Sequence, residues 1–319
     1  MKFKKVLKMN NIQQLIGNTP LVKINYKIDD KIKTAFFKAE WFNFTGSIKD
    51  RVAYQIISDA INEKKLDSTK TIVETTSGNM GLSLCAVAKS FNIKTAIFMP
   101  EFMSEERKTL LKMYGAELHL TPDFNTAFIE AEKYAKENNG FLTLQFENES
   151  NLKAHKNTAE EILKQTNGDF TAFLAGMGTS GTLMGVGKVI KQKTSAKVIG
   201  LEPKSSQVFT KGYSLGKHKL QGLSDDIIPK LYDAKLLDDI VQVSDEDAIA
   251  MAQKLSNTFG FGVGISSGAN FIGVVLTGLN KVVSVFADDN KKYLSTDLAK
   301  PITTKLVDSI ELIDYEIIK

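Results

Sequence analysis

The chain of 319 residues has few of the side chains that build disulfide frameworks or metal sites. Its single cysteine, Cys85, excludes an internal disulfide and fits a reducing compartment. Cys85 lies in the apolar stretch LSLCAVA, which favours core packing over a reactive role. The histidines, His119, His155 and His218, are far apart, and no His/Cys/Asp cluster has ligand spacing. We therefore expect no metal site.

Charge of one sign and long apolar runs are also scarce. The 41 basic and 37 acidic residues leave a formal net charge of +4, with no concentrated basic motif, so we expect no nucleic-acid partner. The basic start MKFKKVLKMNN lacks an apolar run of signal-peptide length behind it, and no stretch approaches the length of a membrane span. These absences predict a soluble, cytoplasmic protein that does not act at a membrane.

Low-complexity linkers and solenoid repeats are absent, and an alternation of short patterns takes their place. Strand-like runs such as TIVE (71–74), TAIFM (95–99) and FLTLQF (141–146) alternate with helix-period runs such as 52–61, and the second half of the chain repeats the alternation. The helix-like run 244–255 opens with a Ser-x-x-Asp capping pattern. Alternating strands and helices predict βαβ units and mostly parallel sheets. Two such sets, dividing near residue 150, predict an α/β fold with two open, mostly parallel-sheet domains.

Two turns that follow predicted strands have the composition of anion sites, which matters because open α/β sheets bind ligands beyond the carboxyl ends of their strands. TTSGNMG (75–81) offers helix-start N–H groups and hydroxyls to an anion such as a carboxylate. A simple βα turn with an N-cap explains the same residues. GMGTSGTLMG (176–185) has the composition of a phosphate cradle, since glycines let the backbone approach and the helix dipole favours a dianion.

The second turn is not a nucleotide P-loop, because it has no Gly-Lys-Ser/Thr ending, and a dinucleotide fingerprint fits it poorly. Taken alone, a glycine-rich turn is weak evidence for phosphate. ISSGAN (265–270) starts another predicted helix and taken alone indicates an N-cap.

A lysine stands at a similar junction in NFTGSIKDR (43–51). Lys49 lies between a tight turn and a helix start, where it is either an ordinary surface charge or an amine held against an electrophile. Lysine together with a phosphate-type turn suggests pyridoxal 5'-phosphate, whose aldehyde forms a Schiff base with a lysine amine.

Seven motifs strengthen this interpretation by their order: IGNTPLVKI (16–24), GSIKDR (46–51), TSGNMG (76–81), QFEN (145–148), GTSGT (178–182), SSGA (266–269) and KKYLST (291–296). Over nearly the whole chain they resemble the cysteine synthase (O-acetylserine sulfhydrylase) and cystathionine β-synthase family of fold-type II pyridoxal-phosphate enzymes. The resemblance implies a tryptophan synthase β-like fold and a homodimer. It also implies a smaller domain at 36–150 with Lys49 and the carboxylate turn, and a larger domain at 1–35 and 151–319 with the phosphate turn.

The resemblance further assigns roles to single residues. Lys49 would hold the cofactor and take the Cα proton of the substrate, work that requires a neutral amine. Asn79 would donate to the ring hydroxyl of the cofactor. Ser266 would face the pyridine nitrogen, and a neutral hydroxyl there gives a milder electron sink that suits β-elimination. The substrate carboxylate would be held by Thr76, Ser77, Asn79, Met80 and Gln145. The phosphate would be wrapped by Gly178, Thr179, Ser180, Gly181 and Thr182.

The chain departs from the family pattern in four places. Three are single changes: Phe44 for proline, Met80 for threonine and Ser180 for glycine. The largest is QGLSDDIIP (221–229), where cysteine synthases have a Gly-Ala-Gly run and cystathionine β-synthases a Tyr-Asp pair. Asp225 and Asp226 either belong to a solvated loop or act catalytically, by orienting an ammonium group or as general base for water or a thiol.

We therefore expect β-replacement or β-elimination on an L-amino acid with a leaving group at Cβ, through an aminoacrylate intermediate. A cysteine synthase-like enzyme makes cysteine from O-acetylserine and sulfide. Water or a thiol as nucleophile would instead release hydrogen sulfide from cysteine and give serine, lanthionine or cystathionine. The alternatives are a non-catalytic regulatory binder on the same scaffold, against which Lys49 argues, and a nucleotide-binding oxidoreductase.

Overall fold

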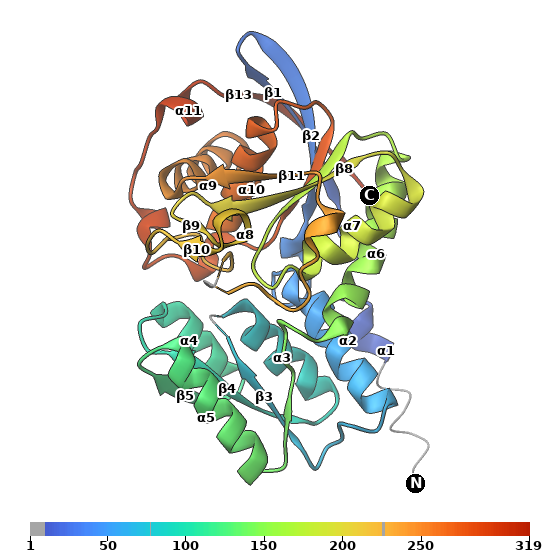
Figure 1. Cartoon of the computed structure of the whole chain (residues 1–319), viewed down its shortest axis with the longest axis vertical. Coiled ribbons are helices and arrows are strands. Elements are labelled where there is room, and N and C mark those ends of the chain that lie inside the picture. Colours follow the sequence, from blue (N-terminus) through green and yellow to red (C-terminus); the bar gives the residue numbers. More distant parts are fainter. Residues whose placement is uncertain (1–9, 77, 225–226) are drawn as a thin grey trace.

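The computed structural model describes residues 10–76, 78–224 and 227–319 (Figure 1). The strands are β1 (Leu21–Ile28), β2 (Lys31–Ala39), β3 (Thr71–Thr75), β4 (Lys94–Pro100), β5 (Glu117–Thr121), β6 (Gly140–Leu142), β7 (Ala172–Gly176), β8 (Lys197–Pro203), β9 (Ser206–Gln207), β10 (Tyr213–Ser214), β11 (Asp239–Val243), β12 (Val282–Phe286) and β13 (Glu311–Ile318).

The α-helices are α1 (Asn10–Gln13), α2 (Lys49–Asn62), α3 (Asn79–Ser90), α4 (Glu105–Met113), α5 (Phe124–Glu137), α6 (Glu149–Thr166), α7 (Gly181–Lys193), α8 (Val208–Lys211), α9 (Asp245–Phe259), α10 (Ile265–Leu276) and α11 (Lys305–Asp308). Short 3₁₀ turns are η2 (Glu40–Phe42), η3 (Ala234–Leu236), η4 (Asn290–Lys292) and η5 (Asp297–Ala299). In the part of the chain that the structure describes, no helix is both long and apolar enough to span a bilayer.

The larger sheet has seven strands in the order β11-β8-β7-β12-β2-β1-β13. The strands from β11 to β2 are parallel, whereas β1 pairs antiparallel with both β2 and β13. Helices α9 and α10 cover one face and α6 and α7 the other, as Figure 1 shows. Each face has its own apolar core, as expected for a parallel sheet buried on both sides.

The smaller sheet has four parallel strands in the order β5-β4-β3-β6. Side chains of β3 alternate between its faces, so Val73 packs against α5 while Ile72 packs in the cluster with α2 and α3. Cys85 of α3 is buried and burial raises the pKa of its thiol to about 11, which agrees with core packing. The two sheets confirm the predicted α/β class with mostly parallel sheets.

Two details differ from the sequence-based expectation. The predicted strand FLTLQF (141–146) ends at Leu142, because Leu144 has a positive φ of 53° that turns the chain away from the sheet. Strand β2 crosses the proposed domain boundary at residue 36 and belongs to the larger sheet. A boundary at residue 36 would therefore divide β2 between two domains. The division of the chain into these two domains stays a prediction.

Candidate active site

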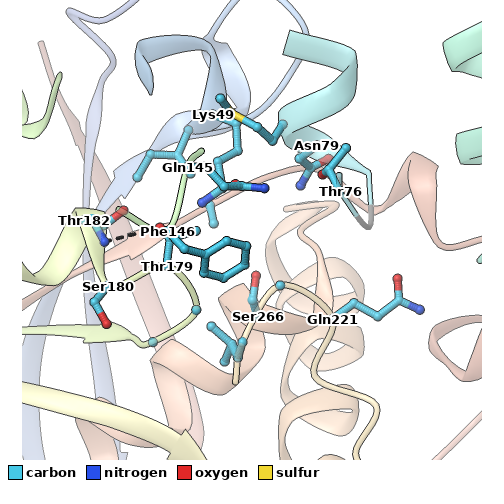
Figure 2. Close-up of a pocket in the computed structure, with 18 of the residues that line it drawn as sticks. Lys49, Thr76, Asn79, Gln145, Phe146, Thr179, Ser180, Thr182, Gln221 and Ser266 are labelled. Carbon is cyan, nitrogen blue, oxygen red and sulfur yellow. Dashed lines mark hydrogen bonds between the residues drawn. The ribbon is translucent and has the colours of Figure 1, made fainter. Parts of the chain in front are cut away.

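A pocket lies where the carboxyl ends of strands from both sheets meet (Figure 2). Thr76 directly follows β3, the glycine-rich turn follows β7, and Ala287 follows β12. The predicted site residues on its wall are Lys49, Thr76, Asn79, Met80, Gln145, Gly178, Thr179, Ser180, Gly181, Thr182 and Ser266. The structure thus brings together predicted residues from distant parts of the sequence. Ser77, Asp225 and Asp226 lie outside the described residues.

Lys49 begins α2, and the turn before it is tied to the larger sheet. The backbone N–H of Ile48 donates to the Ala287 carbonyl at 2.9 Å, and Ser47 forms an isolated bridge with Asp288. Within the turn, the Asp50 carboxylate accepts from the backbone N–H of Thr45 at 2.7 Å and from its hydroxyl at 2.6 Å. These bonds fix the point from which the half-buried Lys49 side chain enters the pocket.

A buried network of ion pairs fixes the first turn of α2 through Arg51. The Arg51 guanidinium donates to Glu40 at 2.7 and 2.9 Å and to Glu161 at 2.7 and 2.8 Å. Lys38 pairs with Glu161 at 2.7 Å, and the Thr19 hydroxyl donates to Glu40 at 2.8 Å. Burial alone would raise the pKa of Glu40, but the Arg51 and Lys38 charges hold it below its usual value.

The IGNTP motif, residues 16–20, bonds to the acidic members of this network. The backbone N–H of Asn18 donates to Glu161 at 3.0 Å, and that of Gly17, whose φ is +81°, donates to Asn43 at 2.8 Å. The motif therefore lies behind the lysine-bearing turn and contributes no side chain to the pocket wall within the described residues.

The turn after β3 presents polar groups at the start of α3. The backbone N–H of Thr76 donates to the Phe98 carbonyl at 3.1 Å, and the Thr76 hydroxyl accepts from the Gly78 N–H at 3.2 Å. Asn79 donates from its side chain to Asp288 at 2.7 Å. The oxygen of the same side-chain amide, Asn79 Oδ1, is buried and has no hydrogen-bond partner among the described residues.

The turn after β7 has the geometry of an anion cradle. Ser180 caps α7 in the left-handed region, with φ of 63° and no side-chain cap bond, and its buried hydroxyl has no partner among the described residues. A Cβ on Gly178 would lie 2.3 Å from the Gly222 carbonyl oxygen, and one on Gly181 would lie 2.0 Å from Asn151 Oδ1. Only glycine allows the backbone to pack this closely at either position.

These observations fit pyridoxal phosphate. The cradle at the start of α7 suits a phosphate, and the hydroxyl of Ser180 offers it a donor. Asn79 Oδ1 and Ser266 offer polar contacts to an aromatic ring that carries a hydroxyl and a nitrogen. The amine of Lys49 lies on the same pocket wall, as Figure 2 shows.

Asn151 joins the two halves of the pocket. Its side-chain amide donates to the Gln145 carbonyl at 2.9 Å and to the Thr179 hydroxyl at 3.0 Å. One side chain of α6 thereby couples the segment that bears Gln145 to the cradle. Asn151 stands in a polar stretch with no glycine or hydroxyl pattern, so the sequence gives no local signal for its role.

His155 is fully buried beside the cradle. Its Nε2 lies 3.2 Å from the Thr182 hydroxyl and its Nδ1 lies 3.4 Å from the Thr158 hydroxyl. Burial, followed by the charges of Lys49 and Arg51, lowers its pKa well below the usual range, so the ring is neutral. The described residues contain no group of His, Cys, Asp or Glu side chains suited to a metal ion.

Further polar residues near the pocket were also not predicted. Asp288 is buried and accepts from the Tyr293 hydroxyl at 2.7 Å, and the Arg107 guanidinium lies over the Tyr293 ring at 5.0 Å. Asn270 fixes the ends of two strands, since its amide donates to Val285 and its carbonyl accepts from Gly176. The KKYLST motif contains Tyr293 and was the available signal for this cluster.

Comparison with known proteins places the site in a family. The model of the pyridoxal-phosphate dependent enzyme family (PALP) matches residues 12–288. Cysteine synthase B of Campylobacter jejuni is 40% identical over 298 residues, covering 90% of this chain and 97% of the relative.

Two solved structures are also similar. The hydrogen sulfide-producing enzyme Fn1055 of Fusobacterium nucleatum superposes with a TM-score of 0.94 at 38% identity, covering 98% of this chain and 99% of that chain. A mutant of Fn1055 in complex with an alpha-aminoacrylate intermediate gives a TM-score of 0.92 at 39% identity, covering 97% of this chain and 98% of that chain. With a family match over most of its length and a pocket that fits the cofactor, the chain belongs to the pyridoxal-phosphate dependent enzymes.

Proposed function

We propose that this enzyme carries out cysteine synthase-like β-replacement and β-elimination on L-amino acids with a leaving group at Cβ, including release of hydrogen sulfide from cysteine. The observation that carries the proposal is a single pocket that joins the Lys49 amine, a carboxylate-type turn and a phosphate-type cradle. The names of its relatives, a cysteine synthase and a hydrogen sulfide-producing enzyme, support both directions of the chemistry.

The proposed roles divide by position in the pocket. The cradle 178–182 would hold the phosphate, Asn79 would face the ring hydroxyl, and Ser266 would face the ring nitrogen. Thr76 and Gln145, with Ser77, Asn79 and Met80, would hold the substrate carboxylate. Fixing both the carboxylate and the ring orients the bonds to Cα, and such orientation of reacting groups lowers the activation barrier.

When bound, pyridoxal phosphate withdraws electrons from Cα of an attached amino acid and so makes the Cα proton acidic. In elimination, that proton passes to Lys49 Nζ and the bond from Cβ to sulfur or oxygen breaks, with the electron pair leaving on the departing group. In replacement, a nucleophile bonds to Cβ and Cα regains a proton. Lys49 must be neutral to accept the first proton.

Two adjacent carboxylates bear on which nucleophile the enzyme uses. Asp225 and Asp226 follow the segment of Gln221, Gly222 and Leu223, which lines the pocket. We propose that one of the two carboxylates orients an ammonium group or takes a proton from water or an amino-acid thiol. Cysteine or homocysteine as nucleophile would give lanthionine or cystathionine. We also propose a homodimer, implied by the family resemblance, and a cytoplasmic location, which the single buried free thiol Cys85 supports.

A product assay tests the proposal. Holoenzyme receives O-acetylserine, cysteine or serine, each with sulfide, homocysteine or water, and the amino acid and the sulfide formed are identified. Cysteine from O-acetylserine and sulfide, or hydrogen sulfide from cysteine, is the expected result. Lys49→Ala is expected to lose both turnover and the visible band of the bound cofactor. A wild-type protein that shows the band but forms no product in any combination would support the non-catalytic binder instead.

A further inference from the structure

A buried carboxyl group that has no role so far stands directly behind the carboxylate-binding residues. Glu74 is the fourth residue of β3, two positions before Thr76, and only 3% of it is exposed. Its carboxyl group accepts a hydrogen bond from the Thr143 hydroxyl. The backbone N–H of Thr75 and the backbone and side-chain amides of Gln145 lie near enough to this carboxyl group to oppose the rise in its pKa.

These neighbours connect Glu74 to the two segments proposed to hold the substrate carboxylate. Thr75 precedes Thr76 in the turn, and Gln145 is itself a pocket residue. The Gln145 side-chain amide donates to the Thr75 carbonyl at 3.4 Å, and the same amide favours the ionised form of Glu74. The charge on Glu74 therefore acts on the orientation of Gln145.

No cation balances this carboxyl group in the described part of the chain. Burial has the strongest influence on its pKa, the groups that oppose it are uncharged donors, and none is an ion pair. The charged side chains on the elements packed against β3 are all exposed: Lys89 of α3, Lys94 of β4, and Glu130, Glu132, Lys133, Lys136 and Glu137 of α5. The other titratable groups on those elements are Cys85, a buried thiol, and Tyr134, whose hydroxyl donates to Glu117.

Burial raises the pKa of Glu74 to about 7, so both of its protonation states are populated near neutral pH. An ionised Glu74 would place a second negative charge behind an incoming carboxylate, in a site of low dielectric constant. A protonated Glu74 would remove that repulsion and leave the Gln145 amide free to donate toward the pocket.

We propose that Glu74 is a positioning residue that takes up a proton when the substrate carboxylate binds, and that its protonation sets the affinity for amino-acid substrates. This inference rests on the proposed function, because it requires an anionic substrate at Gln145 and Thr76. Binding is tight below the pKa of free Glu74 and weakens as the pH rises through it. The effect belongs to binding, so it changes KM and leaves kcat nearly unaltered.

The expected size follows from linkage. We take the Glu74 pKa as about 7 in the free enzyme and about one unit higher when a carboxylate is bound. The affinity for the carboxylate ligand then falls roughly sixfold between about pH 6.5 and about pH 8.5. Near pH 7.5, roughly half a proton is taken up per carboxylate bound.

Calorimetry of the holoenzyme in buffers of different ionisation enthalpy tests the inference. L-Alanine is the probe because it has a carboxylate and no leaving group, and L-alaninamide is the control because it lacks the carboxylate. Wild type is compared with Glu74→Gln, which mimics the neutral acid, and with Glu137→Gln, which removes an exposed charge from α5. We expect wild type and Glu137→Gln to take up roughly half a proton more than Glu74→Gln with L-alanine, and all three to agree with L-alaninamide.

Equal proton uptake by wild type and Glu74→Gln with L-alanine would overturn the inference, even if both proteins turn over substrate. Absence of both turnover and L-alanine binding in wild type would overturn the proposed function and this inference together. Should Glu74→Gln fail to fold, propionate binding to wild type decides, because propionate has a carboxylate and no amine. Proton uptake with propionate near pH 7.5 supports the inference, and its absence refutes it.

Discussion

Replacing Arg51 by methionine should destabilise the protein far more than the loss of an ordinary surface charge. The guanidinium makes two charge-assisted bonds to Glu40, which is fully buried, and two to Glu161. Without Arg51, Lys38 is the remaining cation close to Glu40. Leaving one partner of a buried pair uncompensated costs about 3 to 5 kcal/mol. That is a large share of a total stability of about 5 to 15 kcal/mol.

Urea unfolding followed by tryptophan fluorescence measures this loss, because the single tryptophan, Trp41, follows Glu40 directly. With an m-value of about 3 kcal/mol/M, the midpoint should fall by about 1 to 2 M. Lys193→Met is the matched control, since Lys193 pairs with Glu160 at 2.6 Å but both are exposed. Such a pair contributes about 0 to 1 kcal/mol.

The pH dependence gives a second test. In wild type the pKa of Glu40 is held low, so its contribution to stability is complete above its unfolded pKa and is lost as the pH falls through the folded value. In Arg51→Met, burial raises that pKa and Glu40 takes up a proton under mildly acidic conditions. The stability deficit should therefore shrink from about pH 7 to about pH 5. A midpoint within the error of the Lys193→Met control, or a deficit that does not change with pH, would refute this account of the network.

Three further predictions concern the pocket. Gly181→Ala should lower cofactor affinity measured by equilibrium dialysis, because its Cβ would lie 2.0 Å from a neighbouring amide oxygen, whereas Gly216→Ala, with open space around it, should leave affinity unchanged. Ser180→Gly should raise the thermal stability of the apo-protein by about 1 kcal/mol by relieving a left-handed residue, yet weaken cofactor binding through loss of the hydroxyl; unchanged binding would remove Ser180 from the phosphate site. Asp225→Asn and Asp226→Asn should slow turnover with water or thiols more than with sulfide, and equal rates for all nucleophiles in both variants would contradict the proposed general base.

The sequence could predict the parts of the fold and site that depend on local pattern. The strands TIVE and TAIFM, the capping serine of 244–255 and the glycine-rich turn each carry their signal within a few residues. The structure has β3 and β4 at these strands, and Ser244 caps α9 by accepting from the Asp247 N–H at 3.1 Å. Because parallel strands direct their turns to one edge, the turns could be expected to share a pocket.

What the sequence could not predict depends on contacts between distant segments. The apolar and acidic residues of the tail 302–319 fit either a helix or a strand, and the tail contains β13, which is defined by its pairing with β1. Asp288 and Asn151 serve the site through partners far away in the chain, and neither stands in a motif with a local meaning. Glu74 looks like any acidic residue in a strand, and only the structure shows that it is buried with no ion-pair partner among the described residues.

The order in which the strands appear in the chain has a consequence for how the protein is made. The four-stranded sheet is complete once residue 142 has been synthesised, whereas the seven-stranded sheet needs β13, at the end of the chain, to cover the edge of β1. Such sequence-distant pairing is slow to form. During synthesis on the ribosome, the edge of β1 therefore stays unpaired until residues 311–318 have been made, and nascent chains stalled before residue 311 should be the species that chaperones capture.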